Sequence, residues 1–150
     1  MRLFGRRRPR PGPIFADDGS LVLVLAAHDP AQADSAVLAA AVARGVDVSR
    51  PLLLRQHLVL PDAAAVEVAR DLLAQDGYQL TVPGLAHPSA HPAGVPGGPG
   101  PYDVLAWRTQ VVTAMSAAQE RSRAAGLAQR LGGDVRGWDA LGPADPVPLP

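Results

Sequence analysis

The sequence predicts a two-layer α/β (α+β) protein of the ferredoxin-like type, an antiparallel sheet with helices on one face, extended by an extra N-terminal strand and helix. From Leu52 onward the predicted order is strand, helix, strand, strand, helix, short strand, which is the order of a ferredoxin-like unit. The segments 52–60 and 102–112 alternate in polarity with the period of a strand. In this fold the first and third strands are central, so these two long segments are expected in the middle of the sheet.

The N-terminal block is expected to supply a strand over 21–27 and then a helix. Asp29 suits the N-cap of that helix, Pro30 its first position, and Gln32 the returning side chain of a capping box. Gly45 is expected to end it. The apolar stripe of this helix is Val37, Leu38, Ala41 and Val42.

The later elements follow from the same kinds of signal. A second helix is expected to begin at Pro61-Asp62 and end at Gly77, and a third to run from Thr113 to Gly132-Gly133. A strand is expected over 78–82 between them, and 134–140 is expected to form a short edge strand. The residues expected to face inward from the two helices are Val66, Ala69, Leu73, Ala124, Leu127, Ala128 and Leu131.

Alternation also assigns the faces of the sheet, because successive strand residues point to opposite sides. The inward residues are expected to form one core that includes Leu54, Leu58, Leu80, Leu105, Trp107, Leu127 and Leu131. The open face is expected to carry the polar side chains of Arg55, His57, Gln79, Thr81, Arg108 and Gln110. Such a face suits either solvent or a partner. Stacking aromatics are expected to point inward, which disfavours RNA binding through the sheet.

Length and composition indicate one domain, over 14–141, within the 150 residues. Residues 1–13 are expected to be a disordered basic arm, because they carry five of the 14 Arg and little to bury. A Pro/Gly-rich loop is expected over 83–101 and a disordered tail over 142–150. The arm could touch RNA or an anionic membrane, but a solubilising extension is favoured. The net charge of zero gives no global case for nucleic-acid binding.

Targeting and membrane signals are weak in this sequence. No apolar run approaches the roughly 18 residues of a transmembrane helix. The Arg-rich start and the run 21–27 are separated by Asp17, Asp18 and Gly19, which disfavours a secretory signal. We therefore expect a cytoplasmic protein that does not span a membrane.

Motifs for catalysis, cofactors and metals are not found. The absence of Cys excludes thiol catalysis and Cys-based metal sites. His87 and His91 have helical spacing, but both precede Pro in the Pro/Gly-rich loop, which disfavours a helix there. The glycine-rich segment 94–100 lacks the Lys of a phosphate loop, and no Gly-x-Ser-x-Gly motif occurs. We expect no enzyme activity, no cofactor and no metal.

A set of short motifs, in order, resembles the RraB family of regulators of ribonuclease E activity over residues 31–140. The motifs are Gly45-Val46-Asp47, Gln56-His57-Leu58, Gly77-Tyr78-Gln79-Leu80 and the closing Gly137-Trp138. The resemblance implies a non-enzymatic inhibitor that binds the non-catalytic region of the nuclease. Two features differ from the family pattern: Val135 and Arg136 stand where Tyr and Asp are usual, and the chain lacks an acidic tail.

The function expected from this resemblance is control of RNA degradation by contact with a protein partner such as ribonuclease E. The expected partner-contact residues are Arg55, His57, Arg108, Arg136 and Trp138. Trp138 has two competing roles, a packed structural residue, which we favour, or an exposed contact. The alternative function is a small-molecule sensor or enzyme that uses the open sheet face, and a third is an interaction module with an unrelated partner. A pocket where Arg55, His57 and Arg108 converge would favour the sensor or enzyme.

Overall fold

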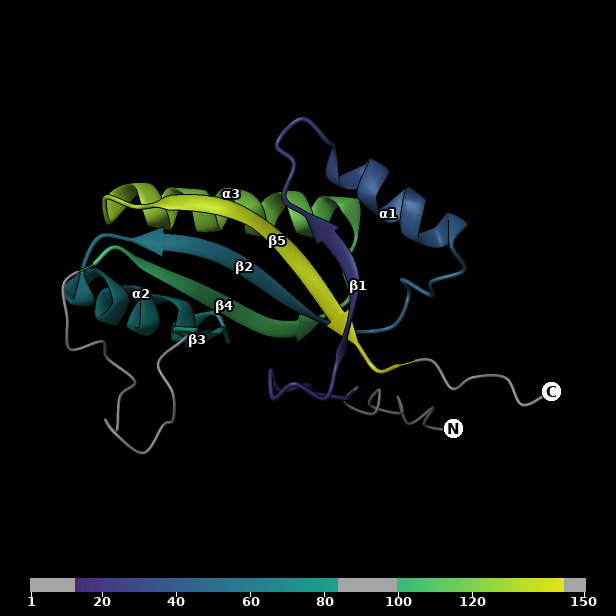
Figure 1. The fold of residues 1–150 in the computed structure, drawn as a ribbon, viewed down its shortest axis with the longest axis horizontal. Coiled ribbons are helices and arrows are strands. Elements are labelled where there is room, and N and C mark those ends of the chain that lie inside the picture. Colours follow the sequence, from purple (N-terminus) through teal and green to yellow (C-terminus); the bar gives the residue numbers. More distant parts are fainter. Residues whose placement is uncertain (1–12, 84–99, 145–150) are drawn as a thin grey trace, which may run out of the picture.

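The computed structural model describes residues 13–83 and 100–144, and Figure 1 shows how they form one sheet with three helices. In chain order the elements are β1 (Val22–Ala27), α1 (Asp34–Ala43), β2 (Leu52–Leu60), α2 (Ala63–Gln75), β3 (Gln79–Thr81), β4 (Tyr102–Gln110), α3 (Ala114–Arg130) and β5 (Asp134–Gly142). The expectations for most of the basic arm, most of the Pro/Gly-rich loop and the end of the tail lie outside the described residues.

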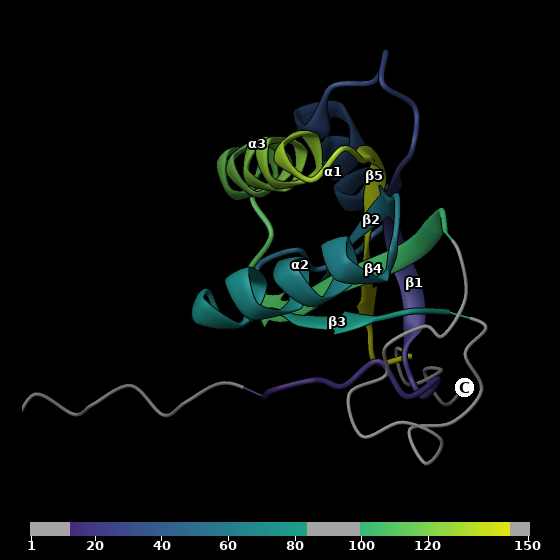
Figure 2. The same ribbon diagram turned by 90° about the vertical axis from the view of Figure 1, so that its left-hand side faces the viewer.

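The five strands pair in the order β1-β5-β2-β4-β3, and every pair is antiparallel. Leaving out β1, this is the strand order of a ferredoxin-like sheet, with β2 and β4 at its centre as predicted. The expected two-layer α/β class is confirmed: the helices lie on one side of the strands (Figure 2). No helix in the described part of the chain is both long and apolar enough to cross a membrane.

The last strand differs from the prediction of a short edge strand. β5 runs over nine residues and lies between β1 and β2. The reason is β1, which hydrogen-bonds to the outer side of β5 and takes the edge position itself. β5 also extends to Gly142, which was predicted to be the first residue of the tail.

Local capping chemistry sets most helix boundaries. The Asp62 side chain accepts a hydrogen bond from the backbone N–H of Ala65 at the start of α2, and Thr113 and Ser116 form a capping box at the start of α3. The prediction for α1 was wrong, because Asp29 caps the backbone N–H of Ala31 in a turn and the helix begins only at Asp34. The side chain of Asp29 therefore stabilises a turn at the place where the first turn of the helix was expected.

The predicted inward face of β4 was wrong by one residue. Val104 and Ala106 are buried beneath the helices, whereas Leu105 and Trp107 lie on the opposite, open face and are only partly buried. Both alternations of β4 carry apolar residues, so periodicity did not decide between them. A slip of one position exchanges every side chain between the faces, and it also turns Arg108 toward the helices.

The buried residues form two clusters rather than the single expected core. One lies under α2 and α3 and includes Leu58, Leu80 and Leu127. The other lies under α1 and the start of α3 and includes Leu54 and Trp138. Gln56 stands between Leu54 and Leu58 on the same face of β2, is 1% exposed, and interrupts the apolar surface there.

The buried side chain of Gln56 is expected to lower the stability of the folded protein. Neither amide atom of this side chain has a hydrogen-bond partner among the described residues. An unsatisfied buried polar group destabilises the folded state, so we expect Gln56→Leu to raise the free energy of unfolding by about 1 kcal/mol. Denaturant unfolding measures this change, with Gln56→Ala as the control that removes the amide but leaves a cavity. A lower stability for Gln56→Leu would mean that the amide is satisfied in solution.

Candidate functional site

The open face of the sheet carries a row of side chains across four strands. Asp139 of β5, Arg55 of β2 and Trp107 of β4 are cross-strand neighbours, and Gln79 of β3 continues the row. We call these four residues the open-face row. Arg55, Gln79 and, on the next row, His57 lie on this face as the alternation predicted.

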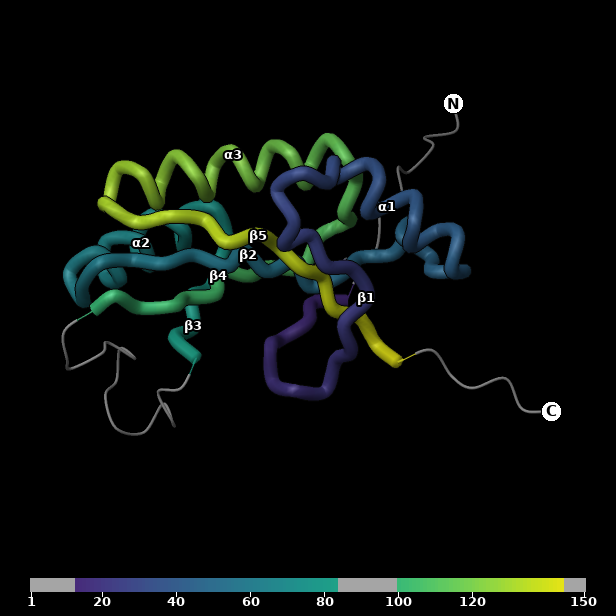
Figure 3. The backbone as a smooth tube through the Cα atoms, turned by 45° about the horizontal axis from the view of Figure 1, so that its top comes forward, coloured from purple at the N-terminus to yellow at the C-terminus, as the bar shows by residue number. Residues whose placement is uncertain are grey.

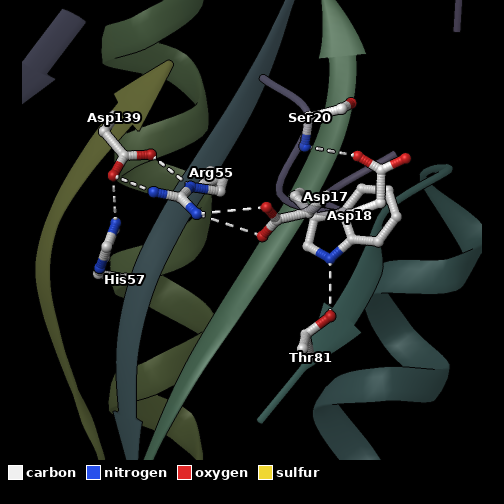
Figure 4. A network of polar contacts seen from close by, with 8 residues as sticks. Asp17, Asp18, Ser20, Arg55, His57, Thr81 and Asp139 are labelled. Carbon is white, nitrogen blue, oxygen red and sulfur yellow. Dashed lines mark hydrogen bonds and ion pairs between the residues drawn. The ribbon is translucent and has the colours of Figure 1, made fainter. Parts of the chain in front are cut away.

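An ion pair between Asp139 and Arg55 occupies one end of the row. The Nε and Nη2 atoms of Arg55 each donate to an oxygen of Asp139 at 2.7 Å, and the Nη1 atom reaches Asp17 at 3.2 Å (Figure 4). The Asp139 side chain is only 5% exposed. This fork geometry fixes both side chains, because two parallel hydrogen bonds restrict the planes of the two groups.

Burial and ionic contacts oppose one another at Asp139. Burial works against ionisation of this carboxyl, but hydrogen bonds with His57 and Arg55 outweigh it and hold the pKa of Asp139 below its usual value. Hydrogen bonding to Asp139 in turn raises the pKa of Arg55, against the effect of its own burial. The pair is therefore charged throughout the physiological pH range.

Two histidines complete this cluster. The Nε2 atom of His57 lies 2.8 Å from the Oδ2 atom of Asp139, and the rings of His57 and His28 meet edge to face at 4.8 Å between centroids. One ligand atom of each of His28, His57 and Asp139 lies within 4.8 Å of the others. Sequence patterns do not bring these three residues together, because His28 follows β1 whereas the other two lie in distant strands.

The segment 13–20, which precedes β1, lies against the open face. The backbone N–H of Phe15 donates to the Oγ1 atom of Thr109 at 2.8 Å, and Asp17 pairs with Arg55. Figure 3 shows this segment as a purple loop across the strands from α3. Leu53, on the same face, is fully buried. The open face is thus partly covered, which alternation in the strands could not predict.

Trp107 is the largest side chain left partly exposed on this face. Its indole Nε1 atom donates to the Oγ1 atom of Thr81 at 2.9 Å, which fixes the ring against β3. Together with Ile14, Phe15 and Gln79 it lines a shallow hollow of about 390 Å³. Ile14 is 89% exposed, so this end of the open face presents apolar surface to solvent.

Arg108 does not belong to the open face, contrary to the prediction. Its Nη2 atom pairs with Glu120 of α3 at 2.8 Å, and its guanidinium lies 4.5 Å from the ring centroid of Tyr78. Tyr78 also donates a hydrogen bond to Glu120 at 2.6 Å. Burial and this hydrogen bond raise the pKa of Tyr78. Arg108 lies in the helix-facing layer because the β4 register places it opposite Leu54.

Trp138 lies in the middle of β5, next to Asp139, and Arg136 lies nearer the start of the strand. Trp138 is fully buried, and its Nε1 atom donates to the Oδ1 atom of Asp34 at 3.1 Å. The ring fills the core beneath α1, so the favoured structural role of Trp138 is confirmed and its alternative role as an exposed partner contact is corrected. Arg136 is exposed where the β2–β5 pairing shifts register, and it borders a hollow that Arg121 also lines.

The chain is similar to one known protein family. Residues 31–140 match a family model described as "RraB: Regulator of ribonuclease activity B". No curated protein and no solved structure match the chain. The matched range begins before α1 and ends within β5, so it includes β2 to β4, all three helices and the motifs quoted for the resemblance.

Proposed function

The chain belongs to the RraB family of regulators of ribonuclease activity, and we propose that it acts without catalysis, by binding a nuclease through the open face of its sheet. The proposed partner is ribonuclease E, and the proposed contact is with the non-catalytic region of that enzyme. The proposal also places the protein in the cytoplasm, where RNA is degraded. The match over residues 31–140 is the observation that supports it most strongly.

The charges of the open face support a binding role over a catalytic one. Arg55 and His57 both direct their polar atoms to Asp139, and Arg108 lies on the opposite side of the sheet. The convergent pocket expected of a sensor or enzyme is therefore not formed by these three residues. Because the Arg55 and Asp139 side chains are already only 18% and 5% exposed, a partner that covers this face removes little further charged surface from water.

Trp107 supplies the apolar anchor for such a contact. It is partly exposed, held by Thr81, and lies beside the exposed Ile14. Trp is enriched at the residues that dominate binding energy, where a rigid aromatic ring fills a pocket on the partner. The proposed contact surface is thus centred on Trp107, with the Arg55–Asp139 pair at its rim.

We expect Trp107→Ala to weaken binding to ribonuclease E from the same host by about tenfold, or about 1.4 kcal/mol. The measurement is a binding titration with the isolated non-catalytic region of the nuclease. Met115→Ala is the matched control, because Met115 is 71% exposed but lies on α3 in the other layer. Equal affinities for the two variants and the parent would contradict binding of the nuclease through the open face.

A further inference from the structure

We propose that His28, His57 and Asp139 form a Zn²⁺ site that joins the end of β1 to β2 and β5. The family assignment says nothing of a metal, and the inference goes beyond the proposed function. Two imidazoles and one carboxylate are a ligand set that Zn²⁺ binds well, with a water in the fourth position. The chemistry of these three side chains therefore points to a borderline-soft divalent ion rather than Mg²⁺ or Ca²⁺.

The spacing of the three groups supports the site. Their ligand atoms already lie within 4.8 Å of one another, and the shortest separation, from His57 Nε2 to Asp139 Oδ2, is 2.8 Å. A tetrahedral ion with bonds of about 2.0–2.1 Å needs ligand atoms about 3.3 Å apart. The ion would replace the proton of the hydrogen bond between His57 and Asp139. The ring of His28 would move toward the ion to complete the set of three protein ligands.

The backbone leaves room for His28 beside β5 only because residue 137 is glycine. Gly137 pairs with His57 across the sheet and has a φ of +129°. A Cβ built there would stand 2.8 Å from the Nδ1 atom of His28 and 2.5 Å from the carbonyl oxygen of Ala27. Any other residue at 137 would push the His28 ring away from His57, so the glycine preserves the approach of the two imidazoles.

The surrounding charges accommodate a cation. Arg55 contributes one positive charge next to the site, but Asp139 and Asp17 both pair with it. With neutral histidines this group carries a net negative charge. Arg55 also orients the Asp139 carboxylate, because its Nε atom donates to Oδ1 and its Nη2 atom to Oδ2, the oxygen that faces His57, and such donors commonly hold carboxylates that ligate metals.

The test is a calorimetric titration of ZnCl₂ into the full chain after removal of metal with a chelator. We expect the parent to bind a single ion, and His28→Ala and His57→Ala to lose about 100-fold or more in affinity, since even outer-shell changes cost 10–100-fold. His28 is exposed, so its replacement leaves the packed core intact. The double variant His87→Ala/His91→Ala is the matched control, because these are the only other histidines of the chain.

A second readout separates site-specific binding from weak surface binding. Saturating ZnCl₂ should raise the midpoint of thermal unfolding of the parent and of the His87→Ala/His91→Ala variant, because a ligand that binds only the folded state stabilises it. It should leave the midpoint of His28→Ala unchanged. No binding by the parent, unchanged affinity in His28→Ala and His57→Ala, or loss of binding in the His87→Ala/His91→Ala variant would each overturn the proposal.

Discussion

Replacing Trp138 by Ala should lower the free energy of unfolding by about 3–5 kcal/mol. The ring is fully buried among residues of β1, α1 and β2, including Leu25, Val37 and Leu54. Its loss leaves a cavity and removes the indole donor from the carboxylate of Asp34. Equilibrium unfolding in denaturant measures the change.

Trp138→Phe is the control for this prediction. It keeps an aromatic ring in the cluster but removes the Nε1–H donor, so we expect a smaller loss, of about 1–2 kcal/mol. The ranking of the two variants tests whether packing or the hydrogen bond dominates. A Trp138→Ala protein as stable as the parent would contradict the buried structural role of this side chain.

Asp139→Asn should lower the free energy of unfolding by about 2–3 kcal/mol. Breaking a buried ion pair typically costs about 3–5 kcal/mol, and the value is reduced here because the Arg55 side chain is still 18% exposed. The exposed Asp103 of β4 is the matched control, and Asp103→Asn should change stability by less than about 0.5 kcal/mol. An equal effect of the two substitutions would show that the two hydrogen bonds between Arg55 and Asp139 contribute nothing to the free energy of unfolding.

The stabilisation that Asp139 provides should decrease as the pH falls. Folding lowers the pKa of Asp139 below its ordinary value of 3.8, so the unfolded chain takes up the proton first as the pH falls. The stabilisation by this carboxylate is therefore complete above about pH 4 and is lost as the pH falls through the lower, folded-state pKa. The stability difference between parent and Asp139→Asn should be constant from about pH 5 to 8 and shrink below about pH 4.

The helices and the central strands could be predicted because their signals are local. Asp62 and Thr113 cap their helices as expected, and β2 alternates with Leu52, Leu54, Leu58 and Leu60 inward. The face of β4 could not be predicted, since Trp107 and Ala106 are both apolar, and the contacts that distinguish the two faces, such as the ion pair of Arg108 with Glu120 of α3, are made with residues distant in sequence. Periodicity within one strand carries no information about a partner in a distant helix.

The candidate site was less predictable than the fold. Arg55 and His57 could be placed on the open face from alternation, but their common partner, Asp139, comes from a strand predicted to lie at the edge. His28 and Asp17 lie in short polar segments without periodicity, and hydrogen bonds rather than a repeating apolar pattern hold such segments in place. Their contacts therefore emerge only when the three-dimensional arrangement is known.

We propose that this chain regulates a nuclease by protein contact alone. The most direct measurement is the rate of RNA cleavage by ribonuclease E from the same host, with and without the protein in stoichiometric amount. We expect a lower rate with the full-length nuclease, no change with a nuclease that lacks its non-catalytic region, and no RNA cleavage by the protein itself. A full-length nuclease that cleaves at the same rate with saturating protein would contradict it.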